Sequence, residues 1–278
     1  MSIKNFVPEF WSEKIEQELK RKHVFCEDCN REYEGKVSQK GDTVHILGVG
    51  SPTIKSLERK NAGGLIDEAG EIEDSSVSLT INQIRYFNYK VGDIDKAQAV
   101  GGVMEALNGE TTEKLANEED KYVAGLCAGN GAKLLYEEPK IVTATNVLDI
   151  IDEGLEKLFE NDVSDSTKIT LTIAPKFFTL FKKAYIDKDT NNHELMENGT
   201  VARYGKAFIK MSNNVFRKDG VDYSPMRTKR AVAFVHALTH TEAYRPERAF
   251  ADAVKGYILF DGKIVRPKEM ITINVKYQ

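Results

Sequence analysis

Two cysteines near the amino terminus have the spacing of a redox or metal motif. Cys26 and Cys29 are separated by two residues, as in a catalytic dithiol or one half of a zinc site. A zinc site would need a second pair of ligands at a usable distance, and a thioredoxin-like site would need a βαβ pattern around it. The sequence offers neither. We therefore expect Cys26, Cys29 and the third cysteine, Cys127, to be reduced thiols without a metal.

Pairs of histidines and carboxylates are the next candidates for chemistry. His236 and His240 would share a face if they lay on a helix, but their surroundings are rich in β-formers, and an extended strand would separate them by roughly 13 Å. They also lack the intervening Glu of a zinc protease motif. Asp93 and Asp95 could act as acid and base, although acidic residues at a helix start are favoured by simple electrostatics. We interpret these four residues as structural.

No motif for binding phosphate or activating a nucleophile is present. Gly48-Val49-Gly50 lacks the third glycine and the following helix of a dinucleotide site, and neither a P-loop nor a nucleophile elbow occurs. The acidic stretch 67–74 does not match an EF-hand, and Asn198-Gly199-Thr200 is a glycosylation sequon that a cytoplasmic chain would not use. We predict no catalytic, cofactor-binding or metal-binding residue, no cofactor, and no enzyme activity.

Composition describes a globular chain with no general attraction to polyanions. The 278 residues are 41% hydrophobic, and 39 Lys and Arg against 43 Asp and Glu give a formal net charge of -4. This balance disfavours a genome-binding role. The charged residues 1–22 do not form a signal peptide, and the longest apolar run, 231–235, is too short to span a bilayer. We expect the protein to be cytoplasmic when made.

The first half of the chain is patterned for extended, projecting elements. Residues 8–22 have helical spacing around Trp11, and alternation over 31–50 predicts a β-hairpin that turns at Lys40-Gly41-Asp42. The polar, irregular stretch 51–74 predicts a projecting loop. A strand that starts at Val77 and continues to Tyr89 could close this hairpin into a long finger.

The second half alternates helices and strands and indicates an α+β protein. We predict a long helix over 93–126 that begins at Asp93 and kinks at Asn108-Gly109, then a helix over 146–159, a strand over 169–173 and a helix over 175–185 that begins at Pro175. Short strands follow over 201–211, 231–238, 253–260, 263–266 and 271–275. The third and fourth of these are predicted to be joined by a tight hairpin at Asp261-Gly262.

Four stretches make the chain resemble the major capsid proteins of tailed bacteriophages with the Hong Kong 97 type fold. Residues 6–12 (FVPEFWS) resemble the start of the arm in one capsid branch, and residues 33–44 resemble its hairpin strands. Residues 86–98 (YFNYKVGDIDKAQ) resemble the junction into the spine helix, and residues 250–267 are similar to the closing strands. The resemblance spans nearly the whole chain.

The resemblance implies a particular domain layout. It gives an N-terminal arm over 1–30, an extended loop over 31–90, a peripheral domain over 91–176 and 250–278, and an axial domain over 177–249. The family's function is to self-assemble into pentamers and hexamers that form an icosahedral head around double-stranded DNA.

The resemblance also implies partners and a location. The implied partners are other copies of the chain, a separate scaffolding protein, a portal protein and an optional decoration protein. The subunit is expected to assemble in the bacterial cytoplasm and to end in the virion capsid. Some family members form lysine to asparagine cross-links. Lys55 and Lys60 are available amines here, but no residue pattern identifies their partners, so this activity is not carried over. The alternatives are an encapsulin-like nanocompartment shell, which shares the fold, and an enzyme with an unfamiliar site.

Overall fold

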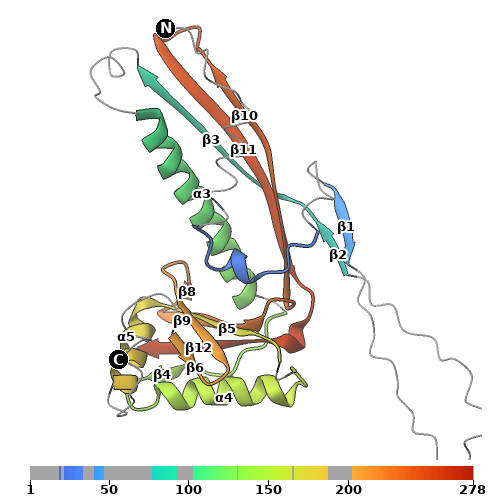
Figure 1. Cartoon of the computed structure of the whole chain (residues 1–278), viewed down its shortest axis with the longest axis vertical. Coiled ribbons are helices and arrows are strands. Elements are labelled where there is room, and N and C mark those ends of the chain that lie inside the picture. Colours follow the sequence, from blue (N-terminus) through green and yellow to red (C-terminus); the bar gives the residue numbers. More distant parts are fainter. Residues whose placement is uncertain are drawn as a thin grey trace, which may run out of the picture.

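The chain folds around two β-sheets that lie end to end (Figure 1). The structure is a computed structural model, and it describes residues 19, 22–33, 41–46, 77–92, 103–129, 131–164, 166–186 and 202–277. Within these residues no helix is long and apolar enough to cross a membrane.

The first sheet is long and narrow and has a helix along one face. Its strands are β3 (Gln83–Gly92), β10 (Val232–Tyr244) and β11 (Ala251–Ile264), all antiparallel, with β11 in the middle. Figure 1 shows the helix α3 (Val103–Ala128) running along this sheet. Phe87, Phe234 and Phe260 from the three strands form the core with Val123 and its neighbours on α3.

Helix α3 buries one regular stripe of side chains, and the stripe is not purely apolar. Its buried residues recur at spacings of three and one, which is the period of one helical face. They are Thr112, Leu115, Ala116, Glu119, Asp120, Val123, Ala124 and Cys127. Two carboxylates therefore sit in the middle of the buried face, where each requires a partner.

A small hairpin covers the base of the opposite face of the long sheet. The strands β1 (Thr43–Ile46) and β2 (Val77–Thr80) pair antiparallel, as the predicted finger requires. They bury Ile46 and Ile81 against Val235 and Leu259 of the long sheet. These sheet residues alternate with Phe234 and Phe260, so they point away from α3.

The second sheet is mixed and compact. Its strand order is β4-β12-β9-β5-β7-β6, with β8 paired to β9. The strands are β4 (Lys140–Val142), β5 (Ile169–Ile173), β6 (Ala202–Tyr204), β7 (Ala207–Met211), β8 (Phe216–Lys218), β9 (Val221–Thr228) and β12 (Met270–Tyr277).

Two helices pack against this sheet to form a second core. They are α4 (Val147–Glu160) and α5 (Pro175–Ile186), and Ile151, Leu158 and Phe177 contribute fully buried side chains. All five residues of β5 are buried, because the sheet is covered on both faces. The second face meets the end of α3, where the Thr272 hydroxyl donates to the Cys127 carbonyl at 2.7 Å.

Several predicted elements are confirmed. The helices predicted over 146–159 and 175–185 are α4 and α5, and Pro175 is the first residue of α5. The strand predicted over 169–173 is β5. The spine helix is present as α3 and runs through Asn108 and Gly109 without interruption. Residues 93–102, which include the predicted cap Asp93, lie outside the described part.

The predicted hairpin at Asp261-Gly262 is wrong. β11 continues straight through both residues as one strand. The Asp261 carboxylate accepts hydrogen bonds from the Tyr122 hydroxyl at 2.5 Å and the Asn82 amide at 3.0 Å. A side chain at Gly262 would approach the Ala233 carbonyl oxygen at 3.3 Å. The pair therefore serves as a buried acceptor and a close backbone approach, not as a turn.

Two other predicted strands are divided. The strand predicted from Val77 to Tyr89 breaks at Ile81 and Asn82. As a result, β2 pairs with β1 in the two-stranded hairpin, whereas β3 belongs to the long sheet. The strand predicted over 201–211 is the hairpin of β6 and β7, which turns at Gly205 with a φ of 56°. Such a positive φ is readily adopted by glycine.

The sheets also do not follow the predicted domain bounds. β5 from the segment 91–176, β9 from the segment 177–249 and β12 from the segment 250–278 all lie in the compact sheet. β10, from the predicted axial segment, lies in the long sheet with β11. The polar stretch 51–74 and the turn predicted around Lys40 fall outside the described residues, apart from Gly41 and Asp42.

Candidate functional site at the junction of the two sheets

An N-terminal segment, residues 22–33, crosses the place where α3 meets both sheets. At its far end Asn30 pairs with the long sheet: its amide donates to the Val232 carbonyl at 2.8 Å, and its carbonyl accepts from the Phe234 amide at 2.9 Å. Between Lys22 and Asn30 the chain makes a 3-10 turn, Cys26–Asp28. We call residues 22–33 the clasped segment.

The Asp120 carboxylate of α3 holds the start of the turn. It accepts three backbone N–H groups, from Val24 at 2.9 Å and from Phe25 and Cys26 at 3.0 Å each. Only 1% of Asp120 is exposed. Its charge is balanced by these donors, since the amides at the start of a helical turn carry partial positive charge.

Arg227 of β9 holds the end of the same turn. Its guanidinium donates to the Phe25 carbonyl at 2.7 Å and to the Asp28 carbonyl at 2.5 Å, and it lies 3.4 Å from the Cys29 sulfur. Arg227 is among the largest fully buried side chains of the described structure. A carboxylate from α3 thus binds the amides of this turn, and a guanidinium from the compact sheet binds its carbonyls.

A second buried carboxylate on α3 joins two histidines. Glu119 Oε2 lies 2.6 Å from His23 Nε2, and Glu119 Oε1 lies 2.6 Å from His236 Nδ1. Burial by itself would raise the pKa of Glu119. The charge of His236 and the hydrogen bonds from both histidines outweigh burial and lower that pKa to about 2.

A cation from the compact sheet completes the fastening. Lys210 Nζ of β7 lies 2.7 Å from an oxygen of Asp28 and 2.7 Å from an oxygen of Glu27. Burial would lower the pKa of Lys210, but hydrogen bonds to these two carboxylates raise it above its usual value. The pair with Asp28 is largely buried, so it is less screened by salt than a surface pair.

The three cysteines gather in this junction as free, buried thiols. Burial raises the pKa of Cys26 and of Cys29, although the Arg227 charge partly opposes the effect at Cys29. Burial also raises the pKa of Cys127, to about 11. A thiol with a raised pKa is a poor nucleophile. Across the described ranges no group of three or more His, Cys, Asp or Glu could hold a metal ion.

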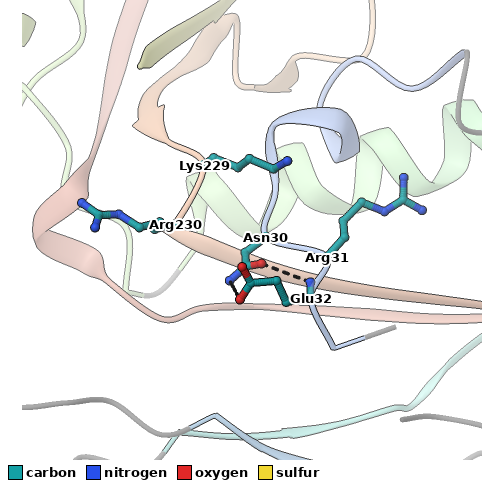
Figure 2. Close-up of a pocket in the computed structure, with 5 residues that line it drawn as sticks. All are labelled: Asn30, Arg31, Glu32, Lys229 and Arg230. Atoms are coloured by element: carbon teal, nitrogen blue, oxygen red, sulfur yellow. Dashed lines mark hydrogen bonds between the residues drawn. The ribbon is translucent and has the colours of Figure 1, made fainter. Parts of the chain in front are cut away.

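A basic depression lies beside the end of the clasped segment (Figure 2). It has a volume of about 340 Å³, and it is lined by Asn30, Arg31, Glu32, Lys229 and Arg230. The Glu32 amide donates to the Asn30 side chain at 3.1 Å, and Arg230 lies 3.4 Å from Glu269. The lining carries more positive than negative charge and includes no nucleophile.

The candidates named from the sequence have different outcomes. Cys26 and Cys29 lie on one turn but serve the core. His236 and His240 lie on the strand β10, as expected, and the strand has a bulge between Leu238 and His240. The partner of His236 is Glu119. Asp93, Asp95, Gly48 to Gly50, Lys55, Lys60 and Asn198 lie outside the described residues. Sequence reasoning missed His23, Glu119, Asp120 and Arg227.

The arrangement fastens chain segments and offers no reaction centre. Its carboxylates and guanidinium are engaged by backbone groups and histidines, and its thiols are protonated. The signal that could have found it is Glu119-Asp120, because the two carboxylates fall on a buried helical stripe whose other members, apart from Thr112, are apolar.

Comparison with known proteins identifies the fold through structure. No family model matches the sequence, and no curated protein does. The fold is similar to a chain of Mycobacterium phage Che8, with a TM-score of 0.68, 27% identity and 90% of each chain covered. It is similar to the capsid of Cyanophage P-SCSP1u, with a TM-score of 0.67, 14% identity, and 92% and 88% of the chains covered.

The chain has the Hong Kong 97 type capsid fold. The predicted α+β class is thereby confirmed, and the fold is that of the tailed-phage major capsid proteins that the sequence resembles. The fold is also similar to a virus-like particle from Pyrococcus furiosus, with a TM-score of 0.59, 12% identity, and 96% and 98% of the chains covered.

Proposed function

We propose that this capsid protein is the major head subunit of a tailed phage, and that it assembles into pentamers and hexamers of an icosahedral shell around double-stranded DNA. The axial domain is then the compact sheet with α4 and α5, at about 131–228 and 270–277. The peripheral domain is α3 with the long sheet. These bounds replace the ones expected from the sequence, because they keep each sheet whole.

The observation that carries the proposal is the exposed face of the long sheet. Among the described residues, helix α3 covers one face, and the β1–β2 hairpin covers the base of the other. Beyond the hairpin, Tyr86 is 80% exposed and pairs in register with Tyr257, which is 39% exposed. At the end of the sheet Phe250 is 88% exposed. Large exposed aromatic side chains on an elongated sheet are typical of surfaces that neighbours cover.

Assembly then proceeds through many modest contacts between copies of the chain. Each subunit presents an elongated face that it cannot bury alone, and closure of the shell makes many such contacts simultaneous. A separate scaffolding protein guides curvature, a portal protein occupies one vertex, and a decoration protein is an optional addition. Assembly takes place in the bacterial cytoplasm, and the product is the virion capsid.

Electron microscopy with sedimentation tests this function. The full chain is expressed alone and together with a candidate scaffolding protein, and both preparations are examined by negative stain. Closed shells or curved sheets of uniform thickness are the expected result. A monomer or small oligomer under both conditions would contradict the proposal.

A nanocompartment shell is the second candidate, and the similarity to the Pyrococcus furiosus particle is the observation that favours it. The two candidates differ in what the particle encloses. Particles purified from a native source would contain DNA, with an absorbance maximum near 260 nm, if the chain is a phage head subunit. Particles that contain a cargo enzyme and no nucleic acid would support the nanocompartment.

A further inference from the structure

The cluster of His23, Glu119 and His236 brings together three separate elements, and all three of its members are ionisable. His23 lies on the clasped segment, Glu119 on α3 and His236 on β10. The side chains of His23 and Glu119 are 0% exposed, and that of His236 is 2% exposed. His23 Nδ1 and His236 Nε2 are also buried and have no hydrogen-bond partner among the described residues.

Two bases share one acid here, so the cluster has three charge states. With Glu119 ionised and both histidines neutral, the buried net charge is negative. With one histidine protonated, the cluster is neutral. With both protonated, it is positive, and both remaining ring N–H groups point into the interior without an acceptor. The first and last states leave a net buried charge, and the last also leaves two buried N–H groups unpaired, whereas the middle state has no net charge and one such group. Because a net buried charge and an unpaired buried donor are both costly, the middle state is the best tolerated.

The surrounding charged groups do not alter this count. On α3, Asp120 is engaged by three backbone amides, and on the clasped segment the Cys26 thiol is neutral at ordinary pH. On β9, Arg227 is engaged by the Phe25 and Asp28 carbonyls. On β11, Asp261 accepts from the Tyr122 hydroxyl. Each of these groups already has its partners.

We propose that His23, Glu119 and His236 form a proton-operated clasp, which holds the clasped segment on α3 and the long sheet when one histidine, and not both, is protonated. Acidification opens the clasp by adding the second proton. Alkaline pH weakens it by removing the first. The clasp belongs to the fold of a single chain, so it is independent of the proposed shell function.

The charge count fixes the shape of the pH dependence. Exposed histidines titrate near pH 6.5. Once the clasp opens, both histidines are protonated below that pH and neither is protonated above it, whereas the closed clasp keeps one proton. Because each side differs by one proton, the open population should rise about tenfold per pH unit on either side of a minimum near pH 6.5.

Hydrogen exchange on the full-length protein tests the clasp. Protection of the amides in residues 23–30 is measured by mass spectrometry from pH 5 to 8, after correction for the intrinsic exchange rate. The wild-type protein should show maximal protection near pH 6.5. His236→Gln should remove the acid limb alone, because one histidine then balances one carboxylate. Glu119→Gln should remove the alkaline limb alone and steepen the acid one.

His45→Gln is the matched control, since His45 is exposed on β1, and it should leave the profile unchanged. Wild-type protection that is flat with pH would overturn the proposal, as would the same two-limbed profile in His236→Gln.

A second measurement needs no variant, in case the substitutions prevent folding. Exchange of the imidazole C2 hydrogen reports how many protons the two histidines of the cluster hold in the wild-type protein. They should together hold one proton over the pH range in which the amides of residues 23–30 are protected. Two protons or none over that range would overturn the clasp.

Discussion

At the scale of single residues, Asp120 does the work of a cap although it lies within a helix. Its two oxygens receive three amides of the clasped segment while its backbone remains part of α3. A buried carboxylate in this position is stabilised by its donors.

Asp120→Asn should destabilise the subunit strongly. Asparagine keeps the size but replaces one acceptor oxygen with an N–H₂ donor that faces backbone amides, so we expect the free energy of unfolding to fall by about 2 to 3 kcal/mol. Urea denaturation of the unassembled subunit measures this. Asp219→Asn is the control, because Asp219 is exposed and has a φ of 52°, which asparagine also tolerates. Equal stability of the two variants would contradict the assignment.

Two glycines on facing elements should respond to alanine with opposite signs. Gly262→Ala places a Cβ 3.3 Å from the Ala233 carbonyl oxygen and 3.6 Å from Leu126, so the melting temperature should fall. At Gly109 of α3 a Cβ meets nothing within 4 Å, so Gly109→Ala should stabilise the helix by about 0.5 to 1 kcal/mol. Thermal unfolding of both variants checks the pair. A destabilising Gly109→Ala would show that the site is less open than described.

The same glycine shows where single-residue prediction fails. Asp261-Gly262 has the composition of a tight hairpin, and local propensity cannot distinguish a turn from a strand that needs a buried acceptor and a bare backbone. The deciding groups are Tyr122, Asn82 and Ala233, which are far from Asp261 in sequence. These tertiary contacts, and not the local turn propensity, determine that Asp261 and Gly262 lie within a strand.

At the scale of elements, periodicity was sufficient where one element faces one core. It predicted α4, β5 and α5 within about a residue or two, because their apolar side chains meet a single packed interior. It failed to assign neighbours. β2 and β3 follow each other closely yet enter different sheets, and the hydrophobic pattern of a strand does not state its pairing partner.

The candidate site was missed for a related reason. Its members come from the clasped segment, α3, β7, β9 and β10, and no linear motif links them. The spacing of Cys26 and Cys29 is typical of redox and metal sites in other proteins, but here both side chains are buried in the core. The acids on the buried stripe of α3 were the visible clue.

Burial at the junction should keep all three cysteines unreactive. Because Cys26, Cys29 and Cys127 are buried and their pKa values are raised, a thiol reagent such as Ellman's should label none of them in the native subunit at pH 7 to 8. Addition of denaturant should release all three. Rapid labelling of Cys26 and Cys29 without denaturant would show that the clasped segment opens on its own.

At the scale of the whole molecule, we expect neighbouring copies of the chain to cover the exposed face of the long sheet. Tyr86→Asp should prevent or slow shell formation while leaving the melting temperature of the subunit unchanged, because the side chain is 80% exposed and contributes little to the fold. Sedimentation velocity under assembly conditions is the measurement. Tyr86→Phe keeps the aromatic surface and should assemble normally. Normal shells from Tyr86→Asp would remove this face from the interface.

The stretch between β1 and β2 provides a second test at this scale. Deletion of residues 51–74 should impair assembly and leave the subunit folded, because both strands of the hairpin and their core contacts remain in the chain. Circular dichroism of the subunit and negative-stain microscopy of the assembly reaction separate the two effects. A shortened chain that forms normal shells would contradict the role expected for this stretch.

The clasped segment also sets an order of events during synthesis. Asp28 leaves the ribosome 199 residues before Arg227, which must grip its carbonyl, and His236 follows later still. At bacterial translation rates this delay is on the order of 10 to 40 s. Throughout that interval the contacts of Arg227 with the clasped segment and of His236 with Glu119 cannot form. The junction of a nascent chain is therefore completed only after most of the chain has been made.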